Sequence, residues 1–145
     1  MDGDQKLLAA AALTAFRLNG QFLELAERLA RPAGLTAAWW QVLGAVLDDP
    51  LPVSAIARDV GITRQAVQRT ADVLVERGLA QYRDNPAHRR AKLVALTDAG
   101  RAAVATIAPQ HRRSAHELVE VLGRERLAEI VEALRALSQA LEKPL

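Results

Sequence analysis

The chain has 145 residues, of which half are apolar and only 3% aromatic, and it carries a formal net charge of +2 without any cysteine. This length fits a single domain with a substantial core, and the lack of cysteine excludes disulfides, thiolate metal sites and thiol redox chemistry. No apolar run reaches the roughly 18 residues of a membrane span and the N-terminus lacks the basic region of a signal peptide, so we expect a cytoplasmic protein.

The charges are distributed unevenly along the chain. Between Ser54 and Arg101, nine Lys and Arg residues stand against five Asp and Glu residues, whereas the rest of the chain is mildly acidic. A basic centre between acidic flanks predicts a localised surface for a polyanion. A solvated helix face would show the same excess, so charge alone leaves both interpretations open.

The first two predicted elements are helices. Apolar residues recur at steps of three and four from Leu7 to Ala30, which predicts an amphipathic helix. The run RPAG ends it, and Thr36 is placed to cap a second helix from Ala37 to about Leu47. The run DDPLP ends the second helix, so Asp48 and Asp49 are turn residues rather than a catalytic carboxylate pair.

A helix-turn-helix pattern follows. A short helix is predicted from about Val53 to Val60, Gly61 makes a turn, and Thr63 caps a fourth helix from Arg64 to about Arg77. The apolar residues of this fourth helix fall on one side. Its other side carries two arginines and two glutamines, which are Arg64, Gln65, Gln68 and Arg69.

The next segment is predicted to be a β-hairpin with a long basic tip. Residues Ala80–Asp84 and Lys92–Leu96 alternate partly in polarity, and they flank the turn-forming run NPAHRR. The tip and its flanks carry five basic or titratable residues, which are Arg83, His88, Arg89, Arg90 and Lys92.

Two long helices complete the chain. Thr97 is expected to cap the first of them, Asp98 suits the helix dipole in its first turn, and Pro109 should bend it. Gly123 interrupts the helical run, which resumes to about Leu141. A regular apolar seam in the last helix predicts a partner helix, and it consists of Leu127, Ile130, Leu134, Leu137 and Leu141.

This order of elements predicts a winged helix-turn-helix, and its polar chemistry fits duplex DNA. The fourth helix is about 21 Å long and fits a major groove about 12 Å wide. Arginine binds the acceptors of guanine, glutamine pairs with adenine, and hairpin arginines suit phosphates and narrow minor grooves. We therefore predict that DNA is contacted by Thr63, Arg64, Gln65, Gln68, Arg69, Arg83, His88, Arg89, Arg90 and Lys92.

At these residues the sequence resembles the multiple-antibiotic-resistance regulator (MarR) family of bacterial winged-helix transcription factors. The family's recognition-helix run is similar to IARDVGITRQAVQRTADVLVERGLA, and its wing is similar to HRRAKLVALTDAG. GLTAAWWQVL matches the usual opening of the second helix, with Trp40 at the customary tryptophan. The family usually has an acidic residue where His88 stands, and His88 could contact a phosphate or be an inert loop residue.

The resemblance covers nearly the whole chain and implies a mainly α fold with a small β-hairpin wing. It implies one domain, 1–145, with a DNA-binding lobe at about 36–100 and dimerisation helices at about 5–30 and 101–145. Two chains would form a homodimer that binds an inverted repeat of double-stranded DNA, usually as a repressor. The two recognition helices would then lie about 34 Å apart, one turn of DNA.

Members of this family often bind small aromatic or phenolic effectors between the dimer body and the DNA-binding lobe. The resemblance implies such a cavity here, and effector binding would shift the DNA-binding population. The candidate lining residues are Phe16, Arg17, Trp39, Trp40 and His111. The alternative is that one of the two tryptophans packs in the core and the other lies partly at the surface.

No pattern indicates an enzyme, a metal site or a cofactor. His111 and His116 are five residues apart, so one helix face does not present both to a metal. Two other functions stay open: a winged-helix module that contacts protein rather than DNA, and a ligand-binding or metal-buffering protein. The basic hairpin and the Arg/Gln face favour DNA.

Overall fold

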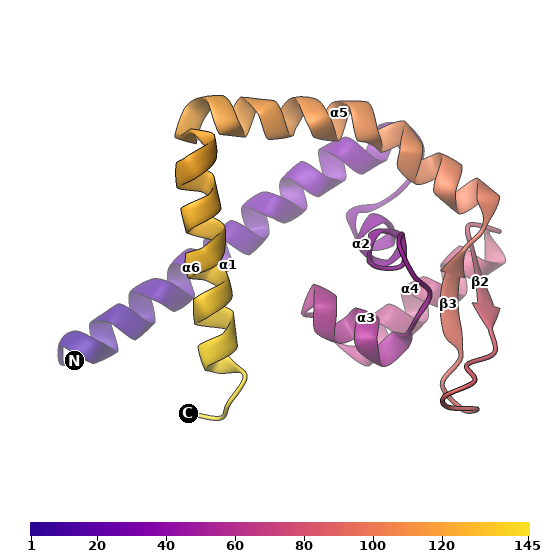
Figure 1. The fold of residues 1–145 in the computed structure, drawn as a ribbon, viewed down its shortest axis with the longest axis horizontal. Helices are drawn as coiled ribbons and strands as arrows, with labels where there is room; N and C mark the ends of the chain where they lie inside the picture. The colour runs from indigo at the N-terminus through magenta and orange to yellow at the C-terminus, as the bar shows by residue number, and fades with distance from the viewer. The chain divides into compact units, whose positions relative to one another are not determined.

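Six α-helices and a three-stranded antiparallel sheet form the fold in the computed structural model, which describes residues 1–145 (Figure 1). The mainly helical fold with a β wing, predicted from the sequence, is confirmed, and none of the helices has the length and apolar character that a membrane crossing requires. The elements in chain order are α1 (Gly3–Ala30), the 3-10 helix η1 (Arg31–Ala33), α2 (Ala37–Ala45), β1 (Leu51–Pro52), α3 (Val53–Val60), α4 (Arg64–Glu76), β2 (Ala80–Arg83), β3 (Leu93–Leu96), α5 (Asp98–Leu122) and α6 (Arg124–Leu141).

The chain forms two compact units, Met1–Ile107 and Ala108–Leu145. The first contains α1 to α4, the sheet and the beginning of α5, and the second contains the rest of α5 and α6. Helix α5 continues through Pro109 without interruption. Within the second unit, Gly123 has a φ of 85°, and the chain turns sharply there between α5 and α6 (Figure 1).

The core of the first unit centres on α4, which packs against α2, α3 and β2. The residues of α4 that are buried are Val67, Ala71 and Leu74, at steps of four and three. Because this spacing puts all three on one side of the helix, the opposite side of α4 faces solvent. The amphipathic pattern predicted for α4 is therefore confirmed.

Side chains predicted to cap helices do so. The hydroxyl oxygens of Thr36 and Thr63 each accept a hydrogen bond, at 3.1 Å, from the backbone N–H three residues further along. Glu27 adds a cap between two elements, because its Oε2 accepts from the N–H of Ala37 at 2.9 Å and joins the end of α1 to the start of α2. Each cap satisfies an N–H group that the helix itself leaves unpaired.

The wing contains one strand more than the sequence predicts. Strand β3 is central and pairs antiparallel with β2 on one side and with β1 on the other. In the added pair, Leu51 lies opposite Val94 and Pro52 lies opposite Leu93. A two-residue edge strand that contains proline has no sequence signature. Its consequence is that the start of α3 is joined directly to the wing.

The start of α5 is held against the turn that follows α4. The Thr97 hydroxyl accepts from the N–H of Gly100 at 3.1 Å and donates to the carbonyl of Gly78 at 2.6 Å. The N–H of Thr97 donates to the carbonyl of Leu79 at 3.3 Å. Gly100 approaches this turn so closely that a Cβ atom added to it would lie 1.9 Å from the Leu79 carbonyl oxygen.

Candidate nucleic-acid interface

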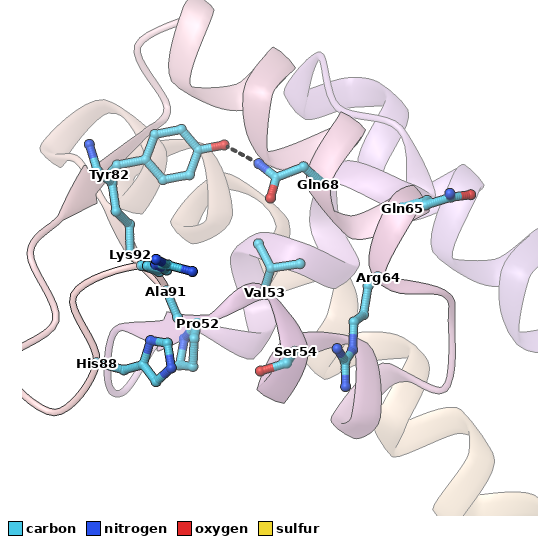
Figure 2. Close-up of a pocket in the computed structure, with 11 residues that line it drawn as sticks. Pro52, Val53, Ser54, Arg64, Gln65, Gln68, Tyr82, His88, Ala91 and Lys92 are labelled. Carbon is cyan, nitrogen blue, oxygen red and sulfur yellow. Dashed lines mark hydrogen bonds between the residues drawn. The ribbon is translucent and has the colours of Figure 1, made fainter.

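A groove of about 800 Å³ lies between the start of α3, the exposed side of α4 and the wing (Figure 2). Pro52, Ser54 and Tyr82 contribute to its wall. Six of the ten residues that the sequence predicts to contact DNA also line it, and these are Arg64, Gln65, Gln68, His88, Arg90 and Lys92. The fold thus brings the polar side of α4 and the basic wing tip to one concave surface.

The other four predicted residues lie outside this groove. Thr63 caps α4 and, with Arg64, lines a second hollow of about 470 Å³ beside Arg58. The remaining three, which are Arg69, Arg83 and Arg89, are exposed on α4, at the end of β2 and in the wing tip. Ser54 and Arg58 of α3 also line these hollows, and no pattern in the sequence predicts them because nothing there shows that α3 borders this surface.

The cations of this surface have no acidic partner. The structure contains one salt bridge, which joins Arg135 to Glu132 on α6. None of the Arg and Lys side chains predicted to contact DNA is therefore in an ion pair. Exposed cations in this state can neutralise phosphates without first breaking an internal bridge, and the release of counterions from DNA then favours binding.

Backbone hydrogen bonds shape the wing tip into two consecutive turns. The N–H of His88 donates to the carbonyl of Asn85 at 3.1 Å, and the N–H of Ala91 donates to the carbonyl of His88 at 3.2 Å. Arg89 and Arg90 occupy the second turn. The conformation of this tip is thus supported by main-chain contacts.

Gln68 is held by the side chains of Asp72 and Tyr82, two residues not predicted to belong to the site. Its Nε2 donates to Asp72 Oδ1 at 3.0 Å. It also donates to the Tyr82 hydroxyl oxygen at 2.9 Å, the bond drawn in Figure 2. The Tyr82 hydroxyl in turn donates to Asp72 Oδ1. The four-residue spacing of Gln68 and Asp72 is a usable sequence signal for the first contact, whereas only the fold brings Tyr82 of β2 to α4.

We expect Tyr82 to ionise at an unusually high pH. Burial of the phenol raises the pKa of Tyr82 from 10.0 to about 12, and the hydrogen bond to Asp72 and the charge of Asp72 act in the same direction. Because Tyr82 is the only tyrosine of the chain, an absorbance titration of the phenolate reports this residue alone. The midpoint should lie near 12 in the wild type and lower in Asp72→Asn.

The sign of the effect on stability follows from this raised pKa. The neutral hydroxyl contributes stability that is fully present below pH 10.0, the unfolded value, and is lost as the pH rises through about 12. A wild-type midpoint at the ordinary value, or an equal midpoint in Asp72→Asn, would contradict the environment described for Tyr82.

The residues proposed for an effector cavity do not line this groove. Phe16 and Arg17 lie on α1, where the Phe16 side chain is 72% exposed. Trp39 and Trp40 are both half-buried and pack against the core. Arg77 lies over the Trp39 ring, with its guanidinium carbon 4.9 Å from the ring centre. His111 belongs to the second unit, and the effector cavity stays a prediction.

The helix-turn-helix and the wing are similar in sequence to known proteins. Residues 33–91, from the end of η1 to the wing tip, match the model of the MarR family. The uncharacterized protein Rv2011c of Mycobacterium tuberculosis is 44% identical over 94 residues. The matched stretch spans 65% of this chain and 66% of that protein.

Solved structures share the fold over nearly the full length. The transcriptional regulator MosR of M. tuberculosis has a TM-score of 0.76 and 27% identity, covering 91% of this chain and 95% of that chain. MosR in complex with DNA gives 0.73 and 25%, covering 92% and 98%.

A Staphylococcus aureus MarR protein in complex with salicylate and kanamycin gives a TM-score of 0.75 at 16% identity, covering 98% of this chain and 97% of that chain. At this identity the likeness concerns the fold alone. The family match across the helix-turn-helix and the wing, together with the fold shared with MosR, identifies residues 33–91 as a winged helix-turn-helix of the MarR family of transcriptional regulators.

Proposed function

We propose that this protein is a sequence-specific DNA-binding regulator, a homodimer that binds an inverted-repeat operator and represses transcription. One observation carries the proposal: the exposed side of α4 and the wing tip face one groove, where Arg64, Arg90 and Lys92 stand without ion-pair partners. The DNA complex of MosR, a protein with the same fold, supports this assignment. Such a regulator would act in the cytoplasm, where bacterial DNA lies.

We propose that residues of about 36–100 bind DNA and that residues of about 5–30 and 101–145 form the dimer interface. Helix α1 exposes large apolar side chains, with Leu13 at 68% and Phe16 at 72%. On α6, Leu134 is 40% exposed and Leu141 52% exposed. Large contiguous apolar exposure is unusual in a monomer, and a second copy of the chain is the partner we propose for these faces.

Leu134→Glu should shift the protein from dimer towards monomer, because it places a charge in the apolar seam of α6. Sedimentation at micromolar concentration is the measurement, and the wild type should sediment as a dimer. Arg135→Ala is the matched control, since it removes only the exposed salt bridge to Glu132 on the same helix, a contact worth roughly 0–1 kcal/mol. A wild-type monomer at this concentration would contradict the homodimer.

We also propose that a small aromatic or phenolic effector lowers the affinity for DNA. The S. aureus MarR complex with salicylate supports this class of ligand. Phe16, Arg17, Trp39, Trp40 and His111 are the residues that we propose to bind this effector. Thermal shifts with salicylate and other phenolics, with and without DNA, test this point.

Selection from a pool of random duplexes tests the main proposal. The wild type should enrich an inverted repeat with half-sites about one helical turn apart, as two symmetry-related recognition helices require. The double variant Arg64→Ala/Arg90→Ala is the control and should enrich no such repeat. If the wild type enriches nothing above the control, the winged helix is a protein-interaction module instead.

A further inference from the structure

We propose that Tyr82 and Asp72 orient the Gln68 amide so that it selects adenine over guanine at one position of each half-site. This inference rests on the proposed DNA-binding function and deepens it. Gln68 would be the residue that contacts the base, and Tyr82 and Asp72 would be positioning residues that determine which base it accepts.

The hydrogen bonds define which end of the amide faces the protein. Gln68 Nε2 lies within 3.0 Å of two oxygen atoms, one from Asp72 and one from Tyr82. The Tyr82 hydroxyl and Asp72 Oδ1 are hydrogen-bonded to each other, so both oxygen atoms lie in nearly the same direction from Gln68 Nε2. A single N–H of the amide can therefore donate to both oxygen atoms in a three-centre bond. The second N–H and the carbonyl oxygen of Gln68 then stay available. Figure 2 shows that oxygen pointing away from Tyr82.

The available pair of groups matches one purine edge and opposes the other. In the major groove adenine presents N7 as an acceptor and N6 as a donor, whereas guanine presents two acceptors, N7 and O6. An amide that offers one N–H and one carbonyl pairs with the adenine edge. Against guanine, the Gln68 oxygen would face O6, and two acceptors without a shared proton repel.

A freely rotating glutamine would avoid this conflict by turning its amide nitrogen towards guanine. In this protein the same rotation would place the Gln68 oxygen against the Asp72 carboxylate, which accepts hydrogen bonds and donates none. It would also give up the charge-assisted bond to Asp72, which belongs to the stronger class of hydrogen bonds. The orientation of the amide is therefore set before DNA arrives.

Tyr82 connects the Gln68 amide of α4 to the wing. It lies in β2, where it pairs with Val94 of β3, and its hydroxyl reaches across to α4. At neutral pH the hydroxyl is protonated and donates to Asp72, and the pKa raised from 10.0 to about 12 extends this state to more alkaline pH. If Gln68, Tyr82 and Asp72 only joined the wing to α4, replacing Tyr82 or Asp72 would change the overall affinity for DNA but leave the base preference unchanged.

Base preference is therefore the measurement. Gln68→Ala first identifies the operator position that depends on this residue. Full-length wild type and variants are then titrated with operators that carry adenine or guanine there, using fluorescence anisotropy. The wild type should prefer adenine by about 5- to 150-fold, the range of one bidentate contact. Tyr82→Phe and Asp72→Asn should each lower that ratio by about 2- to 12-fold, the worth of one hydrogen bond.

Gln65→Ala is the matched control, because Gln65 lines the same groove on the same helix and has no hydrogen bond to Gln68, Asp72 or Tyr82. It should leave the adenine-to-guanine ratio at the Gln68 position unchanged. Asp72→Asn also removes a negative charge, which should strengthen binding to both operators equally and cancel in the ratio. Circular dichroism tests whether each variant is folded. If Tyr82→Phe is unfolded, the base preference of Asp72→Asn alone tests the inference.

The outcomes separate this inference from the proposed function. If the wild type selects an operator and Gln68→Ala abolishes an adenine preference, but both positioning variants keep the wild-type ratio, the inference is overturned and the DNA-binding function stands. If Gln68→Ala changes no adenine preference, the inference is also overturned. If the wild type selects no DNA, the proposed function fails and the inference with it.

Discussion

Replacing Gly100 with alanine should destabilise the first unit by about 3 kcal/mol or more, at or above the upper range for overpacking. The added methyl carbon would lie 1.9 Å from the Leu79 carbonyl oxygen and 2.9 Å from the Leu79 carbonyl carbon. These are backbone atoms, so no side-chain rotation relieves the contact. Separation of α5 from the turn would also stretch the hydrogen bonds from Thr97 to Gly78 and Leu79.

Gly44→Ala is the matched control for this prediction. Gly44 also lies in a helix, but a Cβ atom added there would meet nothing within 4 Å. That variant should gain roughly 0.5–1 kcal/mol from the better helix propensity of alanine. Urea unfolding of all three proteins at one protomer concentration measures both effects. Equal stability of Gly100→Ala and wild type would show that α5 does not approach Leu79 in this way.

Replacing Arg64 with alanine should cost about 1–3 kcal/mol of binding free energy on the preferred operator and should flatten its base preference. Arg64 is the first residue of α4, is exposed, and lines both hollows of the surface. Its guanidinium has no acidic partner. Arg69 lies on the same helix outside the groove, so Arg69→Ala should have a smaller effect than Arg64→Ala.

Arg90→Ala should behave differently, because Arg90 belongs to the wing tip rather than to α4. It should weaken binding to all sequences to a similar degree and lower the salt dependence of binding by about one unit of slope. Titrations of the preferred operator and a scrambled duplex at several salt concentrations separate the two patterns. Arg135→Ala, distant in sequence and paired with Glu132, should bind like the wild type. Wild-type binding by both Arg64→Ala and Arg90→Ala would show that the assigned surface is wrong.

Local sequence patterns predicted most of the elements. The helix from Val53 to Val60 begins and ends at the predicted residues, and Thr36 and Thr63 cap the helices that follow them. These features depend on interactions within about four residues of the chain, such as a cap or one helical turn. The uneven charge and the Arg/Gln side of α4 are likewise visible in the sequence. Six of the ten residues predicted from these patterns to contact DNA line one groove.

Tertiary structure alone decided the contacts between distant residues. Four such contacts join residues at least ten positions apart. They are the pairing of β1 with β3, the Glu27 cap of α2, the approach of Gly100 to Leu79 and the hydrogen bond between Tyr82 and Gln68. No periodicity records such contacts, because they arise only when separate elements pack and their side chains share the space between them. The sequence therefore determined that α4 has an exposed Arg/Gln side and that the wing tip is basic, and the packing of β2 against α4 determined how the Gln68 side chain is oriented.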